Sequence, residues 1–343
     1  MPPGEPRSIE AQILALPETA GSALYGMVDV LAAAGALWQE LVGETPGTIR
    51  LSPRIVGLSD VPFLCGNGIP VAPASGFRAA PEAPILILPE LWLGPHECIL
   101  GRYPEIEAWI CARHAAGAHV YAACSGTVLL AATGLLDGCQ ATSHWGYADM
   151  FRTRFPKVRF QPEPSLVVAD AAGRLVTAGG TTSWHDLALH IIARHISPGE
   201  ALRIAKVYLM KWHSEGQLPF ETLVRRQPHA DAAVRRAEAE IADSFRCADA
   251  ILRAVAVSGI PERTLKRRFR AATGSTLIGA VQKHRIEEAK RLLETSTEAV
   301  EEIAATVGYE NAAFFRQLFR RLCGVAPADY RRLFRHVQPV AGG

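Results

Sequence analysis

Two short segments near the C-terminus match each other at an offset of fifty residues. The first covers residues 263–270 and the second covers residues 313–320. The matched pairs are Leu265 with Phe315, Phe269 with Phe319, Arg270 with Arg320, and Gly274 with Gly324. A repeat requires a fold that accommodates two copies of one local unit. The C-terminal part of the chain is therefore predicted to contain two similar helical units.

Each repeated segment forms a two-sided helix when it is projected at 100° per residue. In the first, Leu265 and Phe269 share one side, and the opposite side carries Arg263, Lys266, Arg267 and Arg270. In the second, the apolar side has Phe315, Leu318, Phe319 and Leu322, and the polar side has Ala313, Arg316, Gln317 and Arg320. An apolar helix and a glycine-containing turn precede each segment, at 251–260 and 300–309. This order predicts two helix-turn-helix units, and Pro261 suits the first helical position of the first one.

A long helix at residues 276–294 is expected to fix the distance between the two units. Its predicted buried side consists of Ile278, Val281, Ile286, Ala289 and Leu293. A last helix at 327–334 would close the domain. The alternative without a binding function is a helical bundle with a solvated basic face, but two cationic faces at matched positions favour contact with DNA.

Charge is unevenly distributed between the two parts of the chain. The 343 residues carry a formal net charge of +2. Residues 231–343 contain 19 basic and 14 acidic side chains, whereas residues 1–230 contain 17 and 20. A basic C-terminal part is consistent with an anionic partner such as double-stranded DNA.

Neither a metal site nor a membrane segment is predicted from the sequence. The seven cysteines lack the paired spacing of metal ligands. The first residues lack the pattern of a signal sequence, and no apolar run reaches the ~20 residues that span a bilayer. We therefore expect a reduced, cytoplasmic protein without a cofactor.

Short apolar strands alternate with helices through the N-terminal part. Strands are expected at 9–16, 49–56, 85–88 and 119–123, helices at 22–41, 104–116, 126–133 and 183–195, and a hairpin at 166–168 and 175–178. Alternation of this kind predicts an α/β fold with a parallel sheet between helical layers. The expected organisation is a sheet domain at 8–210, a polar linker at 211–230, and a helical DNA-binding domain at 231–335.

A cysteine occupies the turn between a strand and a helix in the sheet domain. Cys124 follows the strand at 119–123, and Ser125 and Gly126 open the next helix. This is the order of a nucleophile elbow, which is expected to expose the sulfur near the helix N-terminus and lower the pKa of the thiol. His144 follows twenty residues later and could act as its base. The two readings are a surviving nucleophile and an inherited elbow that lines a ligand pocket, and we favour the second.

Ligands of open parallel sheets bind outside the carboxyl ends of the strands. This rule selects a set of turn residues as candidate ligand contacts: Trp92, Cys124, Ser125, His144, Trp145, Thr181 and Trp184. The three tryptophans could form an aromatic cage around a cationic amine. The bland alternative is that they are ordinary core residues.

The C-terminal residues resemble the AraC/XylS family of bacterial transcription regulators. The similarity covers about 100 residues and rests on Arg263–Phe269, Gly274, Arg285, Ala289, Leu292-Leu293, Ile303-Ala304, Val307-Gly308-Tyr309, Phe315, Phe319, Gly324, Pro327 and Tyr330-Arg331. It implies a seven-helix domain whose two helix-turn-helix units enter successive major grooves. Arg263, Lys266 and Arg267 would face one groove, and Asn311, Ala312, Ala313, Arg316 and Gln317 the next. Pro261 and Val255 depart from the family pattern, which usually has Ser and Ala there.

The sheet domain resembles the PfpI-like branch of the class I glutamine amidotransferase-like superfamily, in the form fused to AraC-type domains (the GlxA type). The similarity rests on the Cys-Ser-Gly turn, residues 134–138, residues 141–145, and residues 177–180 with Asp186. Enzymes of this superfamily place a glutamate beside the cysteine, and Ala23 stands at that position here. The resemblance therefore implies a sensor rather than an enzyme.

Together these features predict a transcription regulator, by family habit an activator. Its expected partners are double-stranded DNA, a small effector such as an amino acid or amine, and a second copy of the chain; RNA polymerase is a further partner that this interpretation allows. The alternatives are a Cys-dependent hydrolase or amidotransferase-like enzyme with a DNA-binding domain, and a nonspecific DNA-coating protein.

Overall fold

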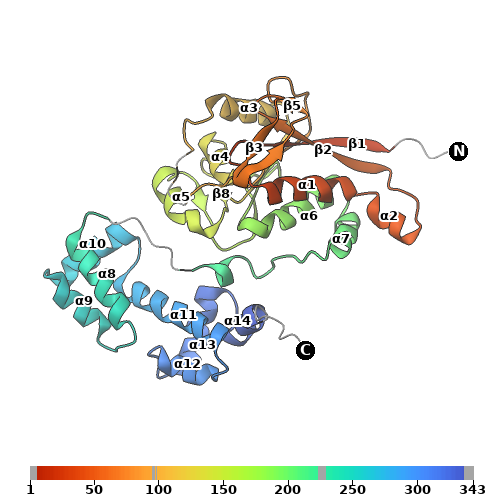
Figure 1. The fold of residues 1–343 in the computed structure, drawn as a ribbon. Helices are drawn as coiled ribbons and strands as arrows, with labels where there is room; N and C mark the ends of the chain where they lie inside the picture. Colours follow the sequence, from red (N-terminus) through yellow and green to blue (C-terminus); the bar gives the residue numbers. More distant parts are fainter. Residues whose placement is uncertain (1–5, 95–96, 98, 223–228, 336–343) are drawn as a thin grey trace. The chain divides into compact units, whose positions relative to one another are not determined.

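The computed structural model describes residues 6–94, 97, 99–222 and 229–335. The chain divides into two compact units, Met1–Gln217 and Leu218–Gly343. The division falls inside the segment 211–230, of which residues 223–228 lie outside the described part. Figure 1 shows an α/β unit followed by an all-helical unit.

The first unit is built on a seven-stranded sheet. Its strands, in spatial order, are β10 (Leu166–Val168), β11 (Leu175–Ala178), β7 (His119–Ala123), β6 (Ile85–Leu88), β1 (Arg7–Leu14), β2 (Ile49–Gly57) and β5 (Ser75–Gly76). All neighbouring pairs are parallel except β10 and β11, which form the predicted antiparallel hairpin. Every residue of β6 and β11 is buried, as expected of strands covered on both faces.

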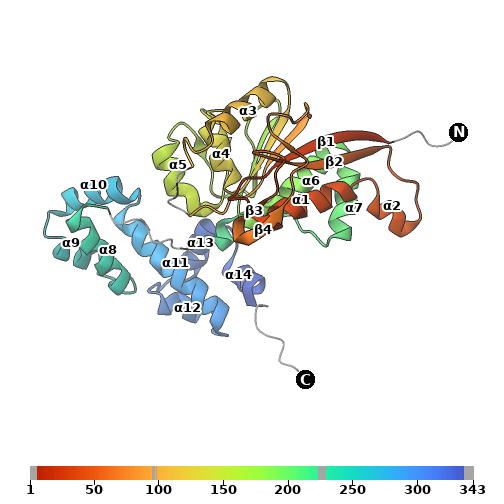
Figure 2. The same ribbon diagram turned by 45° about the horizontal axis from the view of Figure 1, so that its top comes forward.

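Helices cover both faces of the sheet, and Figure 2 shows the two layers. One apolar core includes α1 (Gly21–Ala33), α6 (Trp184–His195) and α7 (Pro198–Val207), and the other includes α3 (Pro104–Ala115), α4 (Gly126–Ala132) and α5 (Ala148–Arg154). The predicted α/β sandwich is confirmed. Small pairs complete the unit: β3 (Phe63–Cys65) with β4 (Ile69–Val71), and β8 (Gln140–Ala141) with β9 (Arg159–Phe160).

The single helix expected at 22–41 is wrong, because the chain breaks it in two. α1 ends at Ala33, and α2 (Leu37–Val42) follows after a turn. Gly35 in this turn has φ 81°, and a side chain on it would lie 2.6 Å from the carbonyl oxygen of Ile49. The close approach of β2 therefore requires a glycine there and ends the helix.

The second unit contains the seven predicted α-helices among its described residues, preceded by a short 3-10 helix at Leu218–Phe220. They are α8 (Ala232–Ser244), α9 (Ala250–Ser258), α10 (Glu262–Thr273), α11 (Leu277–Thr295), α12 (Val300–Thr306), α13 (Ala312–Cys323) and α14 (Pro327–Phe334). The two repeated segments lie in α10 and α13. Both helices end at a glycine in the left-handed region, Gly274 and Gly324.

Helix α11 contributes to two separate apolar cores. Leu277 and Val281 pack with α8, α9 and α10, whereas Ile286, Ala289 and Leu293 pack with α12, α13 and α14. Ile278 was expected on this buried side, but its side chain is 50% exposed. It follows Leu277 by one residue and is therefore rotated away from the face that Leu277 and Val281 share.

No helix in the described ranges has the length and apolar character needed to cross a membrane.

Candidate nucleic-acid interface and sensor site

Helix α10 presents its cationic side to solvent. Leu265 and Phe269 are fully buried, and the four predicted contacts Arg263, Lys266, Arg267 and Arg270 are all exposed. Lys266 pairs with Glu262 one turn earlier, with 2.6 Å between Nζ and Oε1. Within the described part of the chain, no ion pair involves Arg263, Arg267 or Arg270. These guanidinium groups are therefore available to an external anion.

The exposed side of α13 is chemically mixed. Phe315, Leu318 and Phe319 are buried, whereas Ala313, Arg316, Gln317 and Arg320 are exposed. Arg316 forms an ion pair with Glu301 of α12. This face combines a methyl group, an amide and two guanidinium groups, which can together distinguish base edges.

Two predicted contacts at the start of α13 also have structural roles. The Asn311 side chain caps the helix, with Oδ1 accepting a hydrogen bond from the amide of Phe314 at 2.9 Å. Ala312 is half-buried and packs against the core of α12–α14. Asn311 remains exposed, so its amide nitrogen can still donate to DNA.

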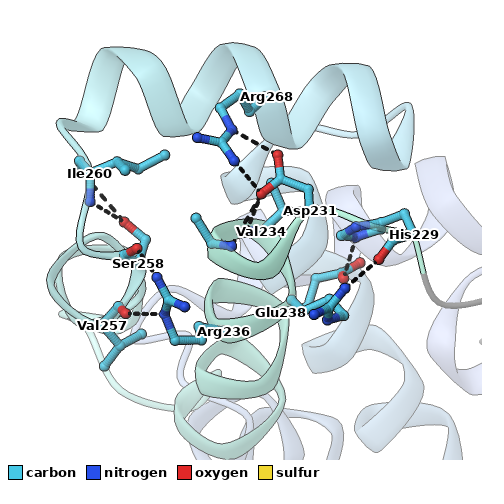
Figure 3. Close-up of polar contacts among 11 residues, drawn as sticks. His229, Asp231, Val234, Arg236, Glu238, Val257, Ser258, Ile260 and Arg268 are labelled. Carbon is cyan, nitrogen blue, oxygen red and sulfur yellow. Dashed lines mark hydrogen bonds and ion pairs between the residues drawn. The ribbon is translucent and has the colours of Figure 1, made fainter.

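Charged side chains fasten the first helix-turn-helix unit to α8 (Figure 3). Asp231 accepts two hydrogen bonds from Arg268 of α10, at 2.7 and 2.6 Å, and also caps α8 through the amides of Ala233 and Val234. The guanidinium of Arg268 lowers the pKa of Asp231 to about 2. Asp231, the residue before α8, therefore connects the start of α8 to α10, the helix with the cationic face.

Arg236 provides a second fastening within the same unit. Its Nε donates to the carbonyl oxygen of Val257 at 2.9 Å, and its Nη2 donates to that of Ser258 at 2.6 Å. Both carbonyls are at the end of α9, beside the turn that leads to α10. The carbonyl groups that a helix end leaves without an intrahelical partner are thus satisfied by a cation, which also suits the helix dipole.

Pro261 does not occupy the first helical position. It precedes α10 as its cap residue, with extended ψ of 142°, and the helix begins at Glu262. Its ψ lies outside the helical region, so the first helical residue comes one position later than predicted.

The elbow at Cys124 has the expected backbone and an unexpected environment. Cys124 has φ 52°, and a side chain on Gly126 would clash with the carbonyl oxygen of Leu88. However, Cys124 is only 2% exposed, and burial, with a smaller contribution from Glu90, raises the pKa of its thiol. The prediction of an exposed sulfur with a lowered pKa is wrong, because the neighbouring strand end covers it.

Glu90 is the functional candidate that sequence reasoning missed. It follows β6, is 7% exposed, and its Oε1 accepts from Cys124 Sγ at 3.7 Å and from Thr181 Oγ1 at 3.2 Å. Its Oε2 has no hydrogen-bond partner among the described residues. Burial raises the pKa of this carboxyl. An acidic residue two positions after a wholly apolar strand was the signal that could have identified it.

The other elbow residues are held by local contacts. Ser125 is fully buried, and its hydroxyl accepts from the amide of Leu91 at 2.7 Å. The Nδ1 of His144 accepts from the amide of Gly146 at 2.9 Å, and burial lowers the pKa of this histidine. Among the described residues the Cys124 thiol donates to Glu90 and forms no hydrogen bond with the imidazole of His144, so the two do not form a Cys–His nucleophile.

The three tryptophans lie in different surroundings. Trp92 is 60% exposed, Trp145 is half-buried with its ring 4.6 Å from that of His144, and Trp184 is 9% exposed. A side chain on Gly26 would clash with the Trp184 ring, which shows how closely this ring packs on α1. The aromatic cage remains a prediction.

An open depression of about 360 Å³ lies beside Trp184 in the first unit. Its lining includes His185, Tyr208, Lys211 and His213. His213 is held in place by the buried carboxylate of Asp186, which accepts from its amide at 3.2 Å and contacts Nδ1 at 3.0 Å. The hydrogen bond to Asp186 raises the pKa of His213.

Comparisons with known proteins match both units. The DJ-1/PfpI family matches residues 97–194, and a helix-turn-helix domain family matches residues 255–333. The chain is 30% identical to HTH-type transcriptional regulator GlxA of Rhizobium meliloti over 61% of this chain and 63% of that protein, so the match covers less than two thirds of the relative. It is 24% identical to HTH-type transcriptional regulator CdhR of Pseudomonas aeruginosa over 82% of this chain and 81% of that protein.

A third relative is named as an enzyme and not as a transcription regulator. The chain is 32% identical to isonitrile hydratase of Pseudomonas putida, over 38% of this chain and 53% of that protein. The DJ-1/PfpI match lies in the first unit and the helix-turn-helix match lies in the second. The two regulators share this combination of domains. This chain therefore joins a DJ-1/PfpI-family domain to a helix-turn-helix domain of the AraC type.

Proposed function

We propose that this protein is a sequence-specific DNA-binding transcription regulator. In this proposal the exposed faces of α10 and α13 contact successive major grooves of one duplex. The observation that carries it is the pair of solvent-facing helix faces connected by α11, of which the α10 face is cationic and the α13 face combines two arginines with an amide and a methyl group. Two relatives named as HTH-type transcriptional regulators support it.

The test is selection of duplexes by the full chain from a random library. The expected result is a recovered sequence that binds ~10³-fold or more tightly than random duplex at the same salt concentration. Equal affinity for all duplexes would instead support the nonspecific DNA-coating alternative.

We further propose that the first unit senses a small metabolite. The buried carboxyl of Glu90, with one oxygen unpartnered among the described residues, favours a ligand with a cationic group, such as an amine or amino acid. Cys124, Ser125, Thr181, His144 and Trp145 would surround it, with Trp92 and Trp184 as further candidates. Because ligand binding and DNA binding are linked, the ligand would stabilise the arrangement of the protein that binds DNA or RNA polymerase. The regulator would act as a dimer of two copies of the chain, and it would activate transcription.

A thermal-shift screen of the full chain against small amines and amino acids tests this step, because a bound ligand raises apparent stability. Glu90→Gln keeps the shape of the side chain and removes its charge, so it should abolish the shift. Glu105→Gln is the matched control, because this exposed carboxylate of α3 lies outside the proposed site, and the shift should persist in it.

The competing function is a Cys-dependent hydrolase or related enzyme. The similarity to isonitrile hydratase favours it, whereas the buried thiol with a raised pKa opposes it. Ligand-dependent transcription that persists in Cys124→Ala would show that turnover is not required. Loss of that response, with the ligand-induced thermal shift and the DNA affinity both unchanged, would favour the enzyme.

A further inference from the structure

The two helix-turn-helix units meet at the middle of α11. The N-terminal half of this helix belongs to the first core through Leu277 and Val281, and the C-terminal half belongs to the second through Ile286, Ala289 and Leu293. Arg285 lies between these two sets. From this position its side chain contacts both helix-turn-helix units.

The guanidinium of Arg285 binds three backbone carbonyls that come from both units. Its Nε donates to Phe245 at 2.6 Å and its Nη2 donates to Cys247 at 3.1 Å, both in the turn between α8 and α9. Its Nη1 donates to Gly308 at 2.8 Å, in the turn between α12 and α13. One planar group thus connects the turns of two units that are 61 residues apart in sequence, from 247 to 308.

The same two turns approach each other directly. Gly308 has φ 94°, and a side chain on it would lie 2.5 Å from the carbonyl oxygen of Arg246 and 3.0 Å from Cζ of Arg285. The guanidinium also lies over the ring of Tyr309, 4.9 Å from its centre. The joint between the units, defined as residues 245–247, Arg285 and residues 308–309, is therefore closely packed.

We propose that Arg285 is a positioning residue that fixes the separation and angle between α10 and α13, and therefore the spacing of the two DNA subsites. The inference rests on the proposed DNA-binding function. Arg285 is half-buried, three of its five N–H groups donate to backbone carbonyls, and its guanidinium packs over Tyr309, so we assign it to positioning and not to DNA contact. A lysine could not replace it, because an ammonium group lacks the planar fork that reaches three acceptors in fixed directions.

A rigid joint has a specific consequence on DNA. Adding one base pair between two subsites moves one of them by ~3.4 Å and rotates it around the helix axis by about 34°. Two helices held at a fixed angle cannot follow this change, whereas two loosely connected units can. Discrimination between spacings therefore reports on the joint and not on the contacts of either helix.

The experiment uses the full chain and a duplex recovered from the random library, with one base pair added or removed between the two subsites. In the wild-type protein each change should weaken binding by roughly tenfold or more, similar to the cost of a mismatched base pair. In Arg285→Lys the difference between spacings should fall to about threefold or less. Tyr309→Leu, which removes the ring under the guanidinium, gives a smaller loss of discrimination and carries the test if Arg285→Lys does not fold.

Arg236→Lys is the matched control, because Arg236 binds two carbonyls inside the first unit only. It should weaken binding at every spacing and keep the wild-type preference. Arg285→Lys with wild-type discrimination, or equal loss in Arg236→Lys, would overturn the inference. A wild-type protein that selects a sequence without a spacing optimum would also overturn it, whereas one that selects no sequence at all would contradict the proposed function itself.

Discussion

The two helix-turn-helix units have the same plan and are stabilised by different forces. The first depends on charged contacts, in which Asp231 holds Arg268 and Arg236 holds the end of α9. The second depends on aromatic packing, where Phe319 contacts Phe315 and Tyr330 with ring centres 5.8 and 5.5 Å apart. A shared helical arrangement therefore does not imply a shared response to salt, pH or mutation.

The exposed faces of α10 and α13 also differ in their chemical composition. All four candidate contacts of α10 are cationic, whereas α13 offers Ala313 and Gln317 beside its arginines. Cationic side chains either bind phosphate without selecting sequence or contact guanine edges, and the amide and methyl groups on the α13 face add contacts that distinguish other base edges. We therefore expect α10 to contribute mainly affinity and α13 mainly sequence preference.

The largest expected effect concerns the aromatic core. Phe319→Ala should destabilise its unit by ~3–5 kcal/mol through the lost burial and the cavity, and the two lost ring contacts add to this. Phe269→Ala, at the matched position, is equally buried, but no ring contact of Phe269 occurs in the described ranges. The cost at Phe319 should exceed that at Phe269 by about 1–2 kcal/mol, measured by hydrogen exchange of α13 and α10 peptides in the full chain. Equal costs would mean that aromatic packing does not distinguish the two units.

Sequence preference is the next largest effect. Arg316→Ala should weaken binding to the selected duplex by ~1–3 kcal/mol and relax the preference at one position, while random duplex is affected less. Competition binding with both duplexes measures the two losses. If they are equal, Arg316 contacts only the DNA backbone, and the assignment of sequence preference to α13 loses its main support.

A substitution on the exposed face of α10 is expected to have a smaller effect on DNA binding, and one of a different kind. Lys266→Ala should weaken binding to all duplexes by a similar factor and reduce the slope of log affinity against log salt by about 1. Its pairing with Glu262 at 2.6 Å is an exposed contact within one helix, so its loss should leave stability almost unchanged. A sequence-dependent loss with an unchanged slope would place Lys266 at a base edge and weaken the contrast between the helices.

The helices of the C-terminal unit, Leu218–Gly343, were predictable because their sequence signals are local. The last helix predicted at 327–334 has the bounds of α14, and the helix with its glycine turn predicted at 300–309 contains α12. The error at Ile278 came from extending one apolar stripe to the helix start, where only Leu277 reaches the core.

The sheet unit was harder to predict where distant segments meet. The elbow at Cys124 follows from its strand–turn–helix order, but the burial of its thiol depends on Glu90, 34 residues earlier and at the end of the adjacent strand. The break at Gly35 similarly depends on the approach of Ile49. A residue pattern within one segment contains no information about which side chain a neighbouring strand end will supply.

The smallest expected effect tests the charged contacts of the first unit through pH. The hydrogen bonds from Arg268 lower the pKa of Asp231 from 3.8 in an ordinary environment to about 2 in the folded protein. Its ion pair therefore stabilises the fold fully above about pH 4, and this contribution disappears as pH falls toward 2. Asp231→Asn retains a good helix-capping residue and removes the charge, so the wild-type advantage in hydrogen-exchange protection of α8 and α10 should be largest above pH 4 and shrink at lower pH. Asp249→Asn removes an exposed pair between the residue before α9 and Arg253 of α9, and it should change protection little at any pH. An advantage that is independent of pH, or that grows as pH falls, would show that the charge of Asp231 does not hold α10, and the contrast between a charged and an aromatic unit would then rest on the aromatic side alone.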